Sequence, residues 1–475
     1  MAQSKRKEHH PSKDKVIVIG SGIGGSAVAA LLQHFGKADV ELFEQNNFVG
    51  GRYASYMKDG FRLDVGCHLI ANGDKGRLGD VLRLLGRPDA VQWGYARKPG
   101  PVFNFKGQRI RFPADIQKIG FSEEELARVV KFYMEINSWD NSQFDLLDDK
   151  DLRGYLASYT EHQATRSILG LLAGVYFVIS DYDTPVGEWA RCNKEVLQNH
   201  AQGYPIGGTG AVPRAYVSIL EDEGGRVHIG KAVKHIIVEG GAATGIELED
   251  GTIHSAQVVI SNVGNKGTME LVGREHYPPE ALATVDAFQY SMGVFALKVA
   301  LDTQFVKNEN MVMFVGDGFE SFLNERDQRT PVPDVASHAM IPIISNMDPT
   351  AAPSGKQLIA MGGGLNGRVS DYTKQDWQDW EKAYLRALEV VFPGIGAHIL
   401  WTVVTTPVDI ERQFGEDGCV IGISQKVGQV GDARPAIVDP CVRNLYHCSA
   451  DSGLHGIGGE LAASSALELF KILTR

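Results

Sequence analysis

A short apolar run that leads directly into a glycine-rich turn constrains the fold of this chain more than any other feature. Residues 15–19, Lys-Val-Ile-Val-Ile, are mostly β-branched, which is typical of a buried parallel strand. Gly20, Gly22 and Gly25 then fill the pattern G-x-G-x-x-G, and the alanine- and leucine-rich residues 26–35 predict a helix. The sequence therefore predicts a strand, a tight turn and a helix in immediate succession.

Each glycine of this turn has a physical task in binding a dinucleotide. Gly20 allows the tight turn, Gly22 lets a pyrophosphate approach the backbone, and Gly25 lets the helix pack closely against the strand. The N-terminus of the helix faces the phosphates with its partial positive charge. Gly24 lies inside the motif, so we expect it to belong to the same binding surface.

A carboxylate follows at the spacing that a ribose requires. Residues 40–43 predict a second strand, which ends at Glu44, about 20 residues after the glycine motif. We expect Glu44 to accept hydrogen bonds from the ribose, with Gln45 beside it at the cofactor. The complete order of strand, glycines, helix, strand and acid predicts a dinucleotide-binding domain.

A second glycine pair favours FAD over a nicotinamide cofactor. Gly50, Gly51 and Arg52 follow soon after the acid, where a nicotinamide domain does not need them. FAD is longer, and its body continues past the adenosine, so close backbone approach and a cation are useful there. The next strand ends in a loop that contains Asp64 and Gly66, and we assign both to the cofactor site.

Together with the C-terminal segment, these motifs resemble the flavin-dependent amine oxidase superfamily, and within it the branch of phytoene desaturases and carotenoid isomerases. The C-terminal segment contains Asp451, the pair Gly458 and Gly459, and a helical pattern over 460–473. The resemblance implies that Asp451 lies near the ribityl chain or the phosphates and that the glycines lie under the isoalloxazine ring. It also implies a helix N-terminus aimed at the flavin, where its dipole stabilises negative charge.

The same resemblance implies an α/β fold, with a Rossmann-like FAD-binding domain of the GR2 type that is discontinuous in sequence and carries an inserted α+β substrate domain. Strands in the middle of the chain are expected to bring Val233 against the adenine. The expected boundaries are 1–14 for a flexible tail, 15–75, 200–265 and 415–475 for the FAD-binding domain, and 76–199 and 266–414 for the substrate domain, as a helical insertion plus a mixed sheet.

Charge and cysteine content exclude several other classes of protein. A net charge of −11 argues against a nucleic-acid-binding surface. The 5 cysteines form no CxxC pair and no zinc-like spacing, so we predict no metal site and a reducing, cytoplasmic compartment. No apolar run reaches the roughly 18 residues that cross a membrane. The basic residues 5–7 favour a solvated tail, with peripheral contact to an anionic membrane as the alternative.

Two segments, one apolar and one rich in glycine, are each consistent with more than one structure. Residues 168–179 form either a buried core helix, the wall of an apolar ligand tunnel or a patch that dips into a membrane. Gly362, Gly364 and Gly367 also satisfy G-x-G-x-x-G, but no helix follows at once and no strand-end acid lies about 20 residues further on. We therefore assign no second dinucleotide site.

The flavin carries the hydride chemistry, so few protein side chains need to take part. His68, which follows the Asp-x-Gly loop, and His455, in the C-terminal glycine-rich turn, are the candidate catalytic residues for proton transfer. The alternative for each histidine is a hydrogen bond to the backbone or to the flavin.

Two functional classes are consistent with these residues. The first is an FAD-dependent oxidoreductase that desaturates, saturates or isomerises a long apolar isoprenoid or polyene substrate. The second is a flavin-dependent amine or amino-acid oxidase that releases hydrogen peroxide and holds the amine in an aromatic cage. Residues 448–468 contain no Trp, Tyr or Phe, which favours the first class.

Overall fold

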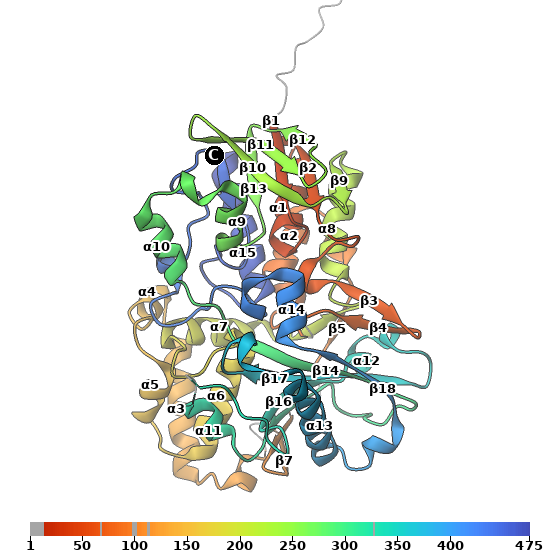
Figure 1. Cartoon of the computed structure of the whole chain (residues 1–475). Helices are drawn as coiled ribbons and strands as arrows, with labels where there is room; N and C mark the ends of the chain where they lie inside the picture. The colour runs from red at the N-terminus through yellow and green to blue at the C-terminus, as the bar shows by residue number, and fades with distance from the viewer. Residues whose placement is uncertain (1–13, 67–68, 97–101, 112–114, 326–327) are drawn as a thin grey trace, which may run out of the picture.

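The computed structural model of the chain describes residues 14–66, 69–96, 102–111, 115–325 and 328–475. Two lobes share these residues, each built around its own sheet (Figure 1). One lobe contains a five-stranded parallel sheet, and the other contains a seven-stranded mixed sheet with a group of helices beside it.

The parallel sheet has the strand order β19-β13-β1-β2-β9 and is assembled from distant parts of the chain. β1 is central, and Ile17 pairs with Glu41 of β2 on one side and with Val259 of β13 on the other. Its strands are β1 (Asp14–Ile19), β2 (Ala38–Glu44), β9 (Arg226–Ile229), β13 (Val258–Ser261) and β19 (Leu445–His447).

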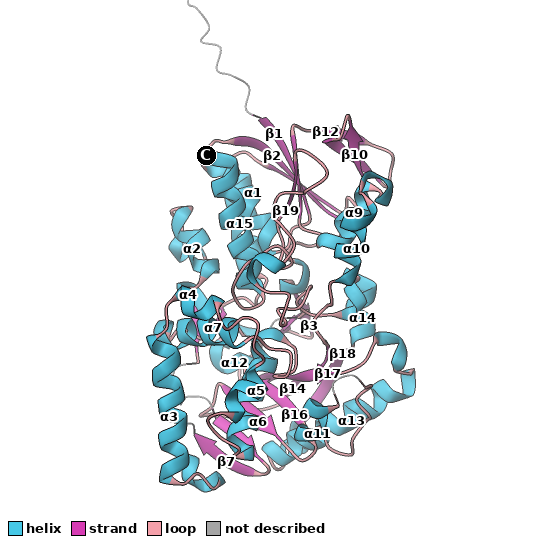
Figure 2. Cartoon of the chain, turned by 90° about the vertical axis from the view of Figure 1, so that its left-hand side faces the viewer, coloured by secondary structure: helices cyan, strands magenta, loops and turns pink. Residues whose placement is uncertain are grey.

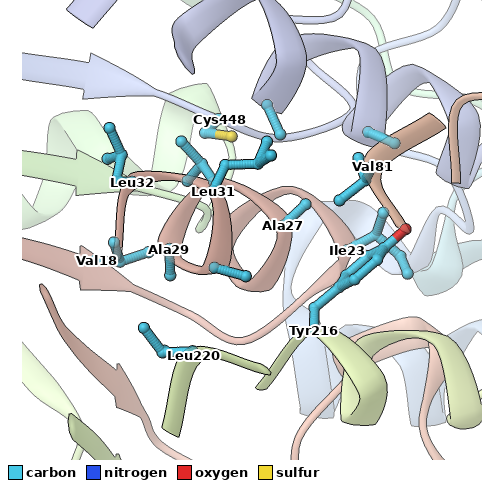
Figure 3. Close-up of a cluster of buried hydrophobic side chains, with 14 of the residues drawn as sticks. Val18, Ile23, Ala27, Ala29, Leu31, Leu32, Val81, Tyr216, Leu220 and Cys448 are labelled. Carbon is cyan, nitrogen blue, oxygen red and sulfur yellow. The ribbon is translucent and has the colours of Figure 1, made fainter. Parts of the chain in front are cut away.

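Helix α1 (Ile23–His34) packs against this sheet and against three further helices, and it is buried along most of its length. Its small residues, such as Ala27 and Ala29, allow the close approach of α8 (Ala211–Asp222), α15 (Gly459–Thr474) and α2 (Arg77–Leu84). Figure 3 shows Leu31 and Cys448 on one side of α1, and Leu220 on the other. At about 25 cal/mol per Å² of buried apolar surface, this cluster stabilises the lobe that positions the glycine turn.

Several smaller elements lie outside the two large sheets. They are a three-stranded antiparallel sheet, a two-stranded hairpin, a second two-stranded antiparallel pair and two helices. These elements are β10 (Val233–Glu239), β11 (Ala242–Leu248), β12 (Ile253–Ser255), β3 (Ser55–Lys58), β4 (Phe61–Asp64), β5 (Trp93–Tyr95), β8 (Gly203–Pro205), α9 (Asn265–Val272) and α10 (Pro279–Ala287).

The mixed sheet has the order β18-β14-β17-β16-β15-β6-β7. All its pairings are antiparallel except that of β15 with β6, which is parallel. Helix α13 (Lys374–Val391) buries Trp380 and Tyr384 against it. Its strands are β6 (Val102–Phe105), β7 (Gln108–Arg111), β14 (Gly293–Leu301), β15 (Met311–Val315), β16 (His338–Pro342), β17 (Gln357–Leu365) and β18 (Ile399–Thr405).

Most of the remaining helices form a group on one side of this sheet, and this group has a core around Phe132 and Trp189 (Figure 2). They are α3 (Glu123–Ser138), α4 (Asn141–Asp145), α5 (Leu152–Ala157), α6 (Gln163–Phe177), α7 (Val186–Asn199) and α11 (Phe319–Asn324), while α12 (Ile344–Met347) and α14 (Pro407–Phe414) lie elsewhere along the sheet.

The predicted fold class is confirmed: a discontinuous Rossmann-like lobe is joined to an α+β lobe. The helical expectation for residues 76–199 was incomplete, because β6 and β7 complete the mixed sheet. Within the described ranges, none of the helices combines the length and the apolar character needed to span a bilayer.

Candidate functional site

A cavity of about 470 Å³ lies between the two sheets and has two chemically different ends. One end is lined by the carboxyl ends of β1 and β2, the glycine turn after β1 and the N-terminus of α15. The other end is lined mainly by apolar residues of α6, α11, β14, β16 and β17, and we call it the apolar arm. Ligands of open α/β sheets bind at the carboxyl ends of the strands, so the first end is the place for a cofactor.

The glycine turn fits the phosphates of a dinucleotide. Gly22 is the N-cap of α1 and offers no side-chain cap, and the first turn contains no acid, so the free N–H groups there are available to an anionic partner. A Cβ on Gly22 would lie 2.5 Å from Oδ1 of Asn262, and one on Gly51 would lie 3.7 Å from the Cα of Gly22. Two backbone segments without side chains therefore face each other, and Gly50 N donates to the carbonyl of Ser21 at 3.1 Å.

Glu44 is buried at the end of β2 and lines the cavity. Its Oε2 accepts hydrogen bonds from the backbone N–H of Ser21 at 2.9 Å and from the Ser21 hydroxyl at 2.6 Å. Its Oε1 accepts from the backbone and side-chain amides of Asn46. The carboxylate thus fixes the glycine turn as well as presenting an acceptor to the cavity.

We expect Glu44→Ala to weaken FAD binding by about tenfold, or about 1.4 kcal/mol. The substitution removes the acceptor of Ser21 and Asn46, so the turn that receives the phosphates loses its fixed position. The measurement is the dissociation constant of FAD, from the fluorescence of the free flavin. Asp39→Ala, at a partly exposed position of the same strand, is the matched control. Equal FAD affinity of the two variants would contradict the assignment.

Arg52 enters the same end of the cavity from the second glycine pair. Its Nη2 donates to Glu416 Oε2 at 2.5 Å and lies 3.3 Å from the carbonyl of Cys419. Its Nε is buried with no hydrogen-bond partner among the described residues. A buried donor without an acceptor is costly, which fits a guanidinium that serves an anionic ligand.

The C-terminal segment after β19 contributes one wall of the cofactor end. Asn262, at the end of β13, donates to the carbonyl of Cys448 at 2.5 Å and ties that segment to the glycine turn. Asp451 is buried and accepts from the backbone N–H groups of Asn265 and Ile423, each at 2.8 Å. A Cβ on Gly458, just before α15, would meet nothing within 4 Å, so the helix N-terminus is open to the cavity.

Most of the predicted cofactor residues are brought together here. Those that line the cavity are Gly20, Gly22, Glu44, Gln45, Gly50, Gly51, Arg52, Gly66, Val233, Asp451, Gly458 and Gly459. Gly24, Gly25 and Asp64 are not among the described lining residues. Asp64 instead accepts from Ser55, Thr209 and Tyr204 beneath the site, and a Cβ on Gly25 would overlap the carbonyl of Gly20. For Gly24, Gly25 and Asp64, as for the lining residues, direct contact with FAD stays a prediction.

Of the two candidate catalytic histidines, the structure describes one. His68 lies outside the described residues. His455 is not among the described residues that line the cavity, and its Nδ1 lies 2.7 Å from Oε2 of Glu188, a fully buried carboxylate of α7. Burial acts to raise the pKa of Glu188, but His455 and Arg191 together hold that pKa below its ordinary value. The pair fixes the turn before α15, so His455 is placed for a structural role.

The apolar arm contains almost no charge. Among the described residues of α6, α11, β14, β16 and β17 that line the arm, the ionisable ones are His338 and Tyr176. Burial lowers the pKa of His338 to about 4, so its imidazole is neutral near pH 7. Part of the 168–179 run is core and part of it, including Gly170 and Gly174 on one face of α6, lines the arm. The run therefore contributes both to the core and to the wall of the cavity, and binding of a ligand against it stays a prediction.

Sequence reasoning missed several lining residues. Gly362, Gly363 and Gly364 lie near the C-terminal end of β17, where they line the arm instead of forming a phosphate turn. A glycine within a strand often marks a close approach to a ligand, and that was the available signal. Glu416 was also missed, and its signal was a polar pair between two glycines, which indicates a left-handed turn.

These features define a flavin-dinucleotide oxidoreductase of the two-lobed type. A family model described as flavin containing amine oxidoreductase matches residues 23–459, and the chain belongs to that family. The cofactor is FAD, and the protein is an FAD-dependent oxidoreductase.

Individual relatives are distant but match over most of their length. A zeta-carotene-forming phytoene desaturase of Myxococcus xanthus is 24% identical, over 92% of this chain and 90% of the relative. A chloroplastic prolycopene isomerase of Daucus carota is 25% identical, over 93% and 77%. The crystal structure of an oxidoreductase from Methanosarcina mazei superposes with a TM-score of 0.73 at 20% identity, over 96% of this chain and 100% of that one.

Proposed function

We propose that this protein desaturates, saturates or isomerises a long, apolar isoprenoid or polyene substrate. The observation that carries the proposal is the apolar arm, which opens from the cofactor end of the same cavity and is walled by aliphatic and aromatic side chains. The desaturase and isomerase names of the similar proteins support the substrate class. FAD would supply hydride transfer when bound, and the part of the chain is to orient the substrate and to exclude water.

The amine oxidase alternative lacks a carboxylate in the described lining of the apolar arm. An alkylammonium ion is held by a carboxylate or by an aromatic cage. The carboxylates of the described lining, Glu44, Glu416 and Asp451, all lie at the cofactor end, and the apolar arm contributes none. A cationic substrate would lose its hydration there with aromatic rings, and no carboxylate of the described lining, to compensate.

Anaerobic absorbance spectroscopy of the purified flavoprotein tests the proposal. We expect a long acyclic polyene, presented in lipid vesicles, to change the flavin spectrum or to be converted to a product with a different number or geometry of double bonds. We also propose that the protein contacts a membrane peripherally, and presentation in vesicles tests that proposal. Turnover of small amines with release of hydrogen peroxide, and no response to polyenes, would establish the oxidase alternative.

We propose His68 as the proton-transfer residue and expect the two histidines to separate in a pH profile. His68→Ala should remove a step from the dependence of turnover on pH. His455→Ala should keep the shape of that profile but lower the free energy of unfolding by about 1 kcal/mol, because the buried carboxylate of Glu188 loses a partly exposed partner. Thermal unfolding and rate measurements on both variants check this. A lost step in His455→Ala would reverse the assignment.

A further inference from the structure

An unusual left-handed turn places an acid in the cofactor end of the cavity. The consecutive residues Gly415, Glu416, Asp417 and Gly418 have φ values of 71°, 61°, 56° and 66°. Two successive non-glycine residues in this region are strained, and such strain concentrates at functional sites. Glu411 holds the turn by accepting from Gly418 N at 2.7 Å.

The strained turn directs Glu416 inward, whereas Asp417 is exposed. The Glu416 side chain is 9% exposed and lines the cavity. Four groups face it: Arg52 from the second glycine pair, Asp451 from the C-terminal segment, Tyr290 from the segment before β14, and Cys419 from its own turn. Arg52 is the single cation of this set.

The contact between Glu416 and Arg52 conflicts with the task proposed for Arg52. The guanidinium follows Gly51, which lies against Gly22 where the phosphates of FAD are expected. Ionised Glu416 would therefore compete with those phosphates for one partly buried cation, and it would repel them. Asp451 adds a second negative charge at this place. The phosphates would bring further negative charge, which cannot be accommodated unless a carboxylate takes up a proton or the side chains rearrange.

We propose that Glu416 is a cofactor-site residue that takes up one proton from solvent when FAD binds, releasing Arg52 to the phosphates. The inference rests on the proposed contact between Arg52 and FAD. No bond other than that of the proton to the carboxylate is made or broken, and the same proton returns to solvent when FAD leaves. Burial raises the pKa of Glu416 to about 7, against the opposing effect of Arg52 and with the help of Asp451.

Proton uptake by Glu416 on binding makes the affinity for FAD depend on pH. Without FAD, Glu416 ionises near pH 7, and with FAD its pKa is higher still because the phosphates are negative. FAD affinity is then constant below about pH 7 and falls by about tenfold per pH unit above it, until the higher pKa is reached. Each FAD that leaves near pH 8 releases close to one proton.

Release of FAD from the holoenzyme on dilution tests the inference. The fluorescence of free FAD gives the dissociation constant from about pH 6 to about pH 9, and an indicator dye in weak buffer counts the protons released. Glu416→Gln is expected to bind FAD with the same affinity across this range and to release no proton. Asp417→Asn removes a charge from the same turn outside the cavity and should keep the wild-type dependence.

Arg52→Met separates this inference from the assignment on which it rests. We expect that variant to bind FAD at least tenfold more weakly at every pH and to lose the pH dependence. If Arg52→Met binds FAD like the wild type, both the role of Arg52 and the proton uptake are wrong. If Arg52→Met is weak but Glu416→Gln keeps the wild-type pH dependence, only the role of Glu416 is wrong.

Discussion

Replacing Gly22 by leucine is expected to abolish FAD binding in a protein that still folds. The new Cβ would lie 2.5 Å from Oδ1 of Asn262, and the rest of the side chain would occupy the space of the pyrophosphate. We expect the affinity for FAD to fall more than about 100-fold, or about 2.7 kcal/mol.

The ratio of flavin to protein absorbance after purification and the dissociation constant of added FAD measure this effect. Gly396→Leu makes the same change in side-chain size at an exposed position and should keep its flavin. A folded Gly22→Leu protein with a full complement of FAD would show that the phosphates bind elsewhere.

Replacing Gly174 by phenylalanine is expected to eliminate turnover of a long substrate while FAD stays bound. Gly174 lines the apolar arm from α6, and a Cβ there would meet no atom within 4 Å. A large side chain therefore enters the cavity without disturbing its neighbours, and loss of a helical glycine favours folding. We expect kcat/KM to fall by about 100-fold or more, about 2.7 kcal/mol of lost transition-state stabilisation.

Gly174→Ala provides the matched control for the phenylalanine variant. It makes the same backbone change but fills little of the arm, so it should keep most of its activity and its flavin spectrum. If Gly174→Phe turns over the polyene as fast as Gly174→Ala does, the substrate does not pass α6, and the apolar arm is not its binding site.

The cofactor lobe could be predicted from the sequence because its signals are local. The strand before Gly20, the glycine turn and the helix after it lie within about 20 residues, so short-range patterns are sufficient to define them. The same holds for the strand that ends at Glu44 and for the helix that begins near Gly459.

The missed elements depend on pairing between distant residues. β6 and β7 follow a stretch without strong strand periodicity, and they become strands because Val102 pairs with Val312 across the sheet. Likewise, the contact of Arg52 with Glu416 joins positions 364 residues apart. Tertiary packing, and not local propensity, decides such cases.

The position of β19 has a consequence for how the chain folds during synthesis. β19 extends the sheet next to β13, and the segment after it contacts α1 through Cys448 and Gly24, which are 424 residues apart. At roughly 5–20 residues per second, a ribosome needs about 20–80 s between these two points. The nascent N-terminal strands are without their last neighbours for that time, so the cofactor end of the cavity is completed only after the C-terminal segment has been made.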